Sequence, residues 1–117
     1  MANWTIYYNP KCGSCRNTLE ILRSKKIEPR IVEYLKEVPS VDEIDSVLKK
    51  LKMEPGEMVR TKEPIYEELK LATAKKSRAE WLKIIHDHPI LIQRPIVVKD
   101  NKAVIARPPE KVNELFA

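Results

Sequence analysis

The chain has 117 residues, of which 43% are hydrophobic and 33% charged, with a formal net charge of +5 at pH 7. This length suits one domain that removes roughly two-thirds of its unfolded surface from water, and the composition excludes a disordered chain. Apolar runs such as Ile96 to Val98 are far shorter than the ~20 residues of a membrane span, so we expect no membrane contact.

The lysines lie in scattered pairs that are interleaved with acidic residues, and no aromatic and basic platform accompanies them. We therefore interpret them as solvated helix faces and expect no direct nucleic-acid binding. The N-terminal segment lacks the features of a secretory signal, and two cysteines provide no disulfide framework. These observations favour a cytoplasmic protein.

The N-terminal part of the chain predicts a β-α-β unit. Residues 4 to 8 alternate between two faces, which is the period of a half-buried strand. Turn residues follow at positions 9 to 13, and a helical pattern begins at about Ser14. A second strand over residues 30 to 35 completes the unit with parallel strands.

Three helices are expected next. Ser40 and Glu43 form a capping-box pattern before an apolar stripe at helical spacing. Pro64 suits the first turn of a short helix. Ser77 and Glu80 repeat the capping box at the start of a third helix.

The period then changes back to that of a strand. Residues 96 to 98 and 103 to 106 flank a polar turn and predict an antiparallel hairpin. A last helix is expected to begin at Pro108 or Pro109. The predicted order is therefore β-α-β, helices, β-β-α.

Cys12 and Cys15 form a CxxC motif between the first expected strand and the first expected helix. A thiolate is the reactive form, and the free amides and dipole of a helix N-terminus lower the thiol pKa from about 8.5. We predict Cys12 to be the catalytic nucleophile because this effect is greatest there. Cys15 could resolve an intermediate on Cys12 or be a small core residue.

A zinc site is the alternative reading of this motif. The two histidines, His86 and His88, are spaced i, i+2 and lie far along the chain. This spacing does not complete a usual zinc ligand set, so no metal is expected. We interpret the histidines as capping or surface residues near a helix end.

Three arginines lie at junctions between expected elements, namely Arg60, Arg94 and Arg107. Guanidinium groups match tetrahedral oxyanions and stay charged at every working pH. Each arginine alone would be an ordinary surface residue. If the fold brings all three near Cys12, they would form a cationic site for phosphate, sulfate or arsenate.

Longer motifs surround these residues. They are Tyr7-Tyr8-Asn9-Pro10-Lys11-Cys12-Gly13, Arg16-Asn17-Thr18-Leu19-Glu20, Arg60, Pro64-Tyr66, His88-Pro89-Ile90-Leu91-Ile92-Gln93-Arg94-Pro95-Ile96-Val97-Val98 and Arg107-Pro108. With this set, nearly the whole chain resembles the arsenate reductases of the glutaredoxin-coupled type, in the arsenate reductase and Spx superfamily. The resemblance implies an α/β, thioredoxin-like fold with a mixed central sheet, as one domain over residues 1–117 with a helical insertion at about 38–90.

The resemblance also implies roles for individual residues. Cys12 matches the nucleophile that attacks arsenate. The matched oxyanion-binding arginines are Arg60, Arg94 and Arg107. The loop that begins at Asn9 is expected to offer backbone amides to the same anion, including those of Gly13, Ser14 and Arg16. Pro95 matches the proline that is cis in thioredoxin-like proteins and faces the active cysteine.

In the implied cycle, a Cys12 adduct of arsenate is attacked by glutathione as a cosubstrate, and glutaredoxin completes the reduction with release of arsenite. No bound cofactor or metal is implied, and a monomer is sufficient. Typical members of this type have a serine where this chain has Cys15, and the best-studied have a histidine where it has Tyr8. With Cys15 present, an internal disulfide could resolve the intermediate, which makes thioredoxin an alternative donor.

Two alternatives remain open. Spx-type regulators have the same scaffold and a CxxC motif at this place, but they act as redox-sensitive partners of RNA polymerase. Arg107 favours the reductase, because those regulators generally lack the arginine-proline pair found here. The other alternative is a family member of unknown substrate that keeps the reactive thiol.

Overall fold

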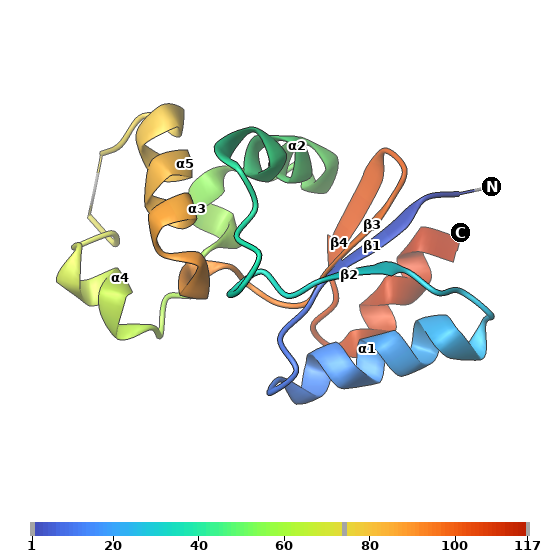
Figure 1. The fold of residues 1–117 in the computed structure, drawn as a ribbon. Helices are drawn as coiled ribbons and strands as arrows, with labels where there is room; N and C mark the ends of the chain where they lie inside the picture. The colour runs from blue at the N-terminus through green and yellow to red at the C-terminus, as the bar shows by residue number, and fades with distance from the viewer. Residues whose placement is uncertain (1, 74, 117) are drawn as a thin grey trace. The chain divides into compact units, whose positions relative to one another are not determined.

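The computed structural model describes residues 2–73 and 75–116, and Figure 1 shows its helices and strands. Residue contacts divide the chain into two compact units. The first unit contains the residues up to Glu37 and those from Arg94 onward, and the second is Val38–Gln93. The helical insertion expected at about 38–90 falls in the second unit. Within the described ranges, no helix combines the length and the apolar character that a bilayer crossing requires.

The first unit is built on a four-stranded sheet with the order β2-β1-β3-β4. Its strands are β1 (Trp4–Tyr7), β2 (Arg30–Val32), β3 (Ile96–Lys99) and β4 (Lys102–Ile105). β1 pairs parallel with β2 and antiparallel with β3, and β3 pairs antiparallel with β4. The predicted α/β class and mixed sheet are therefore confirmed.

The second strand is shorter than the sequence pattern predicts. It ends at Val32, whereas the expected strand continued to Leu35. The Lys36 amide donates to the Glu33 carbonyl at 2.8 Å, so the backbone beyond Val32 bonds to itself in a turn. These hydrogen bonds within the turn replace the backbone hydrogen bonds to a neighbouring strand that a longer strand would require.

One edge of the sheet gathers four segments that are distant in sequence. At the level of Tyr7, the aligned residues of the other strands are Val32, Ile96 and Ile105. The segments that enter or leave the sheet at this edge are residues 8–12, 33–34, 94–95 and 106–108. The Ala106 amide donates to the Pro95 carbonyl at 2.9 Å and joins two of them. The peptide bonds before Pro95 and Pro108 are both cis.

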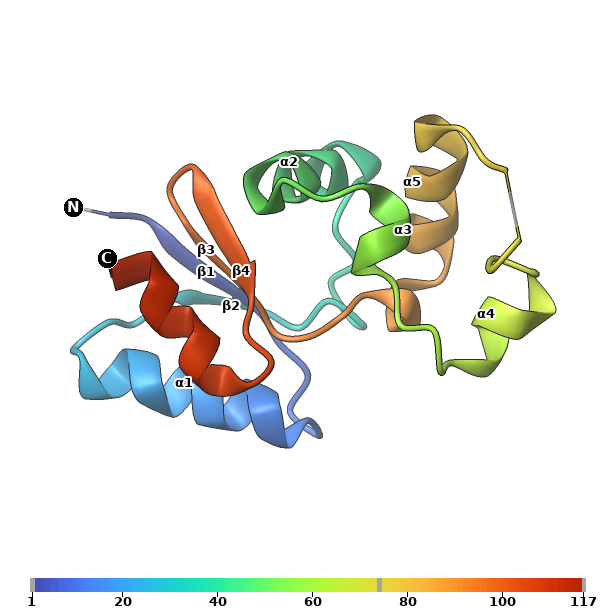
Figure 2. The same cartoon turned by 180° about the vertical axis from the view of Figure 1, so that it is seen from behind.

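Two helices pack on one face of this sheet, as Figures 1 and 2 show from opposite sides. They are α1 (Gly13–Ser24) and η2 (Pro109–Phe116), which contact each other. The buried residues of this core are Ile6, Leu19, Leu22, Val97, Ala106, Val112 and Leu115. The expected last helix is a 3-10 helix, and the Lys111 amide donates to the Pro108 carbonyl three residues back, which is the 3-10 spacing.

The second unit is helical. Its elements are α2 (Val41–Leu51), α3 (Pro55–Met58), α4 (Pro64–Glu68), α5 (Arg78–Asp87) and the 3-10 turn η1 (Pro89–Leu91). α5 contacts α2, α3 and η1. The capping box of Ser77 and Glu80 is present, and Ser40 accepts from the Glu43 amide at 3.1 Å. The short α3 and η1 were not expected, because four or three residues are too few to show a helical apolar stripe.

Candidate active site

Cys12 is the N-cap residue of α1. Its backbone is extended, and its Sγ accepts a hydrogen bond from the Cys15 amide at 3.4 Å. Cys12 is only 8% exposed, so it is a buried residue. A cap normally supplies a side-chain oxygen to the unpaired amides of the first turn, and here the sulfur does so.

The environment of Cys12 favours the thiolate. Burial alone would raise the pKa of this thiol, but the hydrogen bonds from the Cys15 backbone and side chain and from Arg94, with the Arg94 charge, outweigh it. The net result is a Cys12 pKa below its usual value of 9.0. Thiolate character is what makes a cysteine nucleophilic near neutral pH.

Cys15 has the opposite environment. Its side chain is 0% exposed, and burial raises the pKa of the thiol to about 12. The adjacent Cys12 also raises it, while the Asn9 backbone and Arg94 offset only part of the shift. Both cysteines are free, and Cys15 is a buried, protonated thiol at neutral pH.

Asn9 organises the loop that leads from β1 to Cys12. Its carbonyl accepts from the Cys12 amide at 2.9 Å, and its Oδ1 accepts from the Lys11 amide at 3.0 Å. Asn9 therefore fixes the turn with its own backbone and side chain, as asparagine often does in turns. These hydrogen bonds hold the backbone of residues 9–12 in place before Cys12.

The remaining predicted loop residues divide into two groups. The Arg16 amide donates to the Cys12 carbonyl at 3.1 Å, so it already has a partner within α1. The Arg16 Nη1 donates to the Pro10 carbonyl at 3.0 Å and ties the helix to the loop. The amides of Gly13 and Ser14 lie in the first turn, where the helix itself provides no acceptor.

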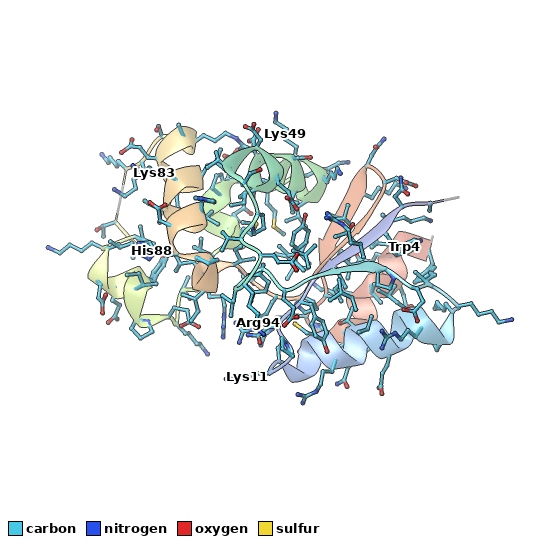
Figure 3. The ribbon with its side chains drawn as sticks, in the orientation of Figure 1. Trp4, Lys11, Lys49, Lys83, His88 and Arg94 are labelled. Atoms are coloured by element: carbon cyan, nitrogen blue, oxygen red, sulfur yellow. The ribbon has the colours of Figure 1, made fainter. Side chains whose placement is uncertain are left out.

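Arg94 is the predicted arginine that acts on the sulfur. It lies in the first unit, close to the first turn of α1 (Figure 3). It lowers the pKa of Cys12, and its Nε is buried with no partner among the described residues. Arg107 is exposed and follows Ala106 at the same edge of the sheet.

Arg60 belongs to the second unit. Its Nη1 lies 2.8 Å from Glu63 Oε1, and its amide donates to the Leu91 carbonyl at 2.7 Å. The structure thus brings Cys12, Cys15 and Arg94 together within the first unit. Arg60 lies in the second unit, where its guanidinium is paired with a carboxylate.

Tyr34 is a residue of this region that the sequence pattern did not single out. It follows β2 at the edge where the Cys12 loop begins, and its side chain is 0% exposed. Its hydroxyl is buried with no partner among the described residues. Burial raises the pKa of Tyr34 to about 12, and Arg94 lowers it only in part. A tyrosine just past a strand gives no sequence signal of this kind.

This arrangement suits nucleophilic attack on an anion. A thiol whose pKa is lowered lies at a helix N-terminus, the Arg94 guanidinium acts on it, and the first-turn amides of Gly13 and Ser14 have no acceptor within the helix. Within residues 2–73 and 75–116, no group of three or more His, Cys, Asp or Glu side chains could hold a metal ion.

Comparisons with known proteins agree with this chemistry. The sequence model of the ArsC family matches residues 7–115. An arsenate reductase of Haemophilus influenzae is 45% identical over 112 residues, which cover 95% of this chain and 97% of that protein. One from Escherichia coli K12 is 40% identical over 116 residues and covers 99% and 82%. The solved arsenate reductase from Vibrio cholerae superposes with a TM-score of 0.92 at 40% identity, over 96% of each chain.

Proposed function

Because the chain belongs to the ArsC family, we propose that it is an arsenate reductase whose nucleophile is Cys12. The observation that carries this proposal is the N-cap position of Cys12, with a lowered pKa beside Arg94. The names of relatives such as the Haemophilus influenzae and Escherichia coli arsenate reductases support the substrate.

In the first step, the Cys12 thiolate forms a sulfur-arsenic bond and one arsenic-oxygen bond breaks. The departing oxygen takes up protons and leaves as water, and arsenic stays in the +5 state. Arg94 and Arg107 balance the charge of the remaining oxygens, and the Gly13 and Ser14 amides donate to them. This step requires neither a metal nor a bound cofactor.

In the second step, two external thiols supply two electrons. They leave as a disulfide, arsenic falls to the +3 state, arsenite is released and the Cys12 thiolate is restored. The sum is arsenate plus two thiols to arsenite, a disulfide and water. We assign the thiols to glutathione, with glutaredoxin as its reductant, because Cys15 is a buried thiol whose pKa of about 12 makes it a poor nucleophile.

The test is arsenate-dependent NADPH oxidation by the purified protein. It is run in parallel with glutathione plus glutaredoxin and with thioredoxin, on the wild type, Cys12→Ser and Cys15→Ser. We expect turnover with the glutaredoxin system that disappears in Cys12→Ser and persists in Cys15→Ser.

Each other outcome has a definite meaning. Turnover that depends on thioredoxin and disappears in Cys15→Ser would show that Cys15 resolves the intermediate. The cycle would then pass through a Cys12–Cys15 disulfide in place of the external thiols. No arsenate-dependent turnover in either system would refute the reductase and favour a redox-sensing regulator on the same scaffold.

A further inference from the structure

Two buried polar side-chain groups of the first unit lack a partner among the described residues. They are the Tyr34 hydroxyl and the Arg94 Nε. Buried polar groups are nearly always hydrogen-bonded, because an unmade bond costs the full desolvation of the group. Two such groups in one unit, next to a reactive thiol, require an explanation.

The sheet register brings the two groups to the same place. Tyr34 lies two residues after Val32, and Arg94 lies two residues before Ile96. Val32 and Ile96 are both aligned with Tyr7, on either side of β1. Tyr34 and Arg94 therefore flank the point where the chain leaves β1 for the Cys12 loop.

The two groups are also chemically complementary. The Nε–H of an arginine can only donate, whereas a phenol oxygen can accept and its O–H can donate. Arg94 acts more strongly on the Tyr34 hydroxyl than Cys15 and Cys12 do, through its charge and through a side-chain hydrogen-bond interaction that falls short of full hydrogen-bond geometry. With burial raising its pKa to about 12, Tyr34 stays protonated and neutral at any working pH.

We propose that Tyr34 is a positioning residue, whose hydroxyl oxygen accepts the Arg94 Nε–H when an oxyanion binds at Cys12. This bond leaves the two terminal nitrogens of Arg94 for the anion, in the planar geometry that suits a tetrahedral oxyanion. Arsenate as the natural anion rests on the proposed function, whereas the Tyr34 to Arg94 bond does not.

The test measures oxyanion binding rather than turnover. Arsenate and, separately, inorganic phosphate are titrated for protection of Cys12 against alkylation by iodoacetamide. The proteins are wild type, Tyr34→Phe, Arg94→Lys and the double variant. We expect Tyr34→Phe to weaken protection about fivefold, the size of one net hydrogen bond. Since lysine has no Nε–H, Tyr34→Phe should have no further effect in the Arg94→Lys background.

Thermal unfolding separates this role from a role in stability. Tyr34→Phe removes a hydroxyl without a partner and should leave Tm of the free protein unchanged or raised. The control is Thr18→Val, because the Thr18 hydroxyl is equally buried and donates to the Ser14 carbonyl at 2.7 Å. We expect this control to lower Tm by about 4 °C and to leave the protection of Cys12 unchanged.

Several results would overturn the proposal. Equal weakening by Tyr34→Phe in both backgrounds would mean that the hydroxyl contacts the anion itself. No weakening in either background, or no protection of the wild type by either anion, would remove the role altogether.

The Tyr34 proposal and the proposed function can fail separately. Absence of arsenate turnover, with the predicted dependence of Tyr34→Phe on Arg94 still observed, would refute the reductase and leave the Tyr34 proposal standing.

Discussion

Two arginines of the second unit, Arg60 and Arg78, have a different environment from Arg94 of the first unit. In the second unit, Arg60 lies 2.8 Å from a Glu63 oxygen, and Arg78 lies 2.6 Å from a carboxylate oxygen of Asp45. At the edge of the sheet in the first unit, the Nε of Arg94 is buried and has no partner among the described residues. Arg60 and Arg78 are thus neutralised by carboxylates, as Arg23 is by Glu28 in the first unit, whereas the Nε of Arg94 has no such partner among the described residues.

This difference separates structural from chemical use of a positive charge. A guanidinium that is held by a carboxylate near the surface contributes at most about 1 kcal/mol to stability. Arg94 instead lowers the pKa of Cys12 and so favours the reactive thiolate. Where an arginine already has a carboxylate, we expect its loss to affect folding, and where it faces the sulfur, we expect its loss to affect chemistry.

Replacement of Arg94 gives the largest expected effect. Removal of one preorganised charge at a developing anion typically costs about 100- to 1,000-fold in rate, so Arg94→Ala should reduce kcat/KM for arsenate by that factor. It should also raise the pKa of Cys12, because the hydrogen bond and the charge of Arg94 are both lost. The measurements are steady-state kinetics and the pH dependence of Cys12 alkylation.

Arg78→Ala is the matched control for that prediction. It removes an arginine whose partner is Asp45, and both side chains are partly exposed at 38% and 26%. We expect a loss of at most about 1 kcal/mol in the free energy of unfolding and no change in kcat/KM. Similar kinetic losses in the two variants would contradict the distinction between the units.

The two cysteines extend the comparison to the pH dependence of stability. The pKa of Cys15 is about 12 in the folded protein, against an ordinary value of 9.0 for a cysteine thiol. From about pH 9 upward the unfolded chain loses this proton and the folded protein keeps it. The free energy of unfolding therefore falls by up to about 1.4 kcal/mol per pH unit, and Cys15→Ala should lack this decline.

Cys12 should give the free energy of unfolding a pH dependence of the opposite sign, measurable in the same experiment. Its pKa is lowered on folding, so its contribution to stability is present above the unfolded pKa and is lost as the pH falls through the folded value. Denaturant unfolding from pH 6 to 10 of wild type, Cys12→Ser and Cys15→Ala measures both effects. An unchanged alkaline slope in Cys15→Ala would show that its thiol titrates normally in the folded protein.

Much of the fold follows from local sequence patterns. The hairpin of β3 and β4, the N-terminal β-α-β unit and the capped helices α2 and α5 were all predicted, because each has its own periodicity or cap. The end of β2 at Val32 was not, because it depends on where the neighbouring strand stops. The 3-10 geometry of η2 was also missed, since apolar spacing over eight residues does not distinguish it from an α-helix.

The candidate site divides in the same way. Cys12 was predicted from its place between a strand and a helix, and the structure describes it as the N-cap of α1. Tyr34 was not found, because burial without a partner is a property of the folded sheet edge and leaves no mark on a sequence. The partner of Arg60 is visible as an i, i+3 acid, but spacing alone does not show that the two side chains meet.

The smallest expected effect concerns the capping box of α5. Ser77 Oγ accepts from the Glu80 amide at 3.2 Å, and Glu80 Oε1 accepts from the Ser77 amide at 3.1 Å. Ser77→Ala removes one of these bonds and should cost about 1 kcal/mol in the free energy of unfolding, measured by urea titration. Because the residue lies in the unit whose polar groups serve structure, the alkylation profile of Cys12 should stay that of the wild type. A shifted profile would mean that the helical unit contributes to the state of the thiol, and the division between the two units would then fail.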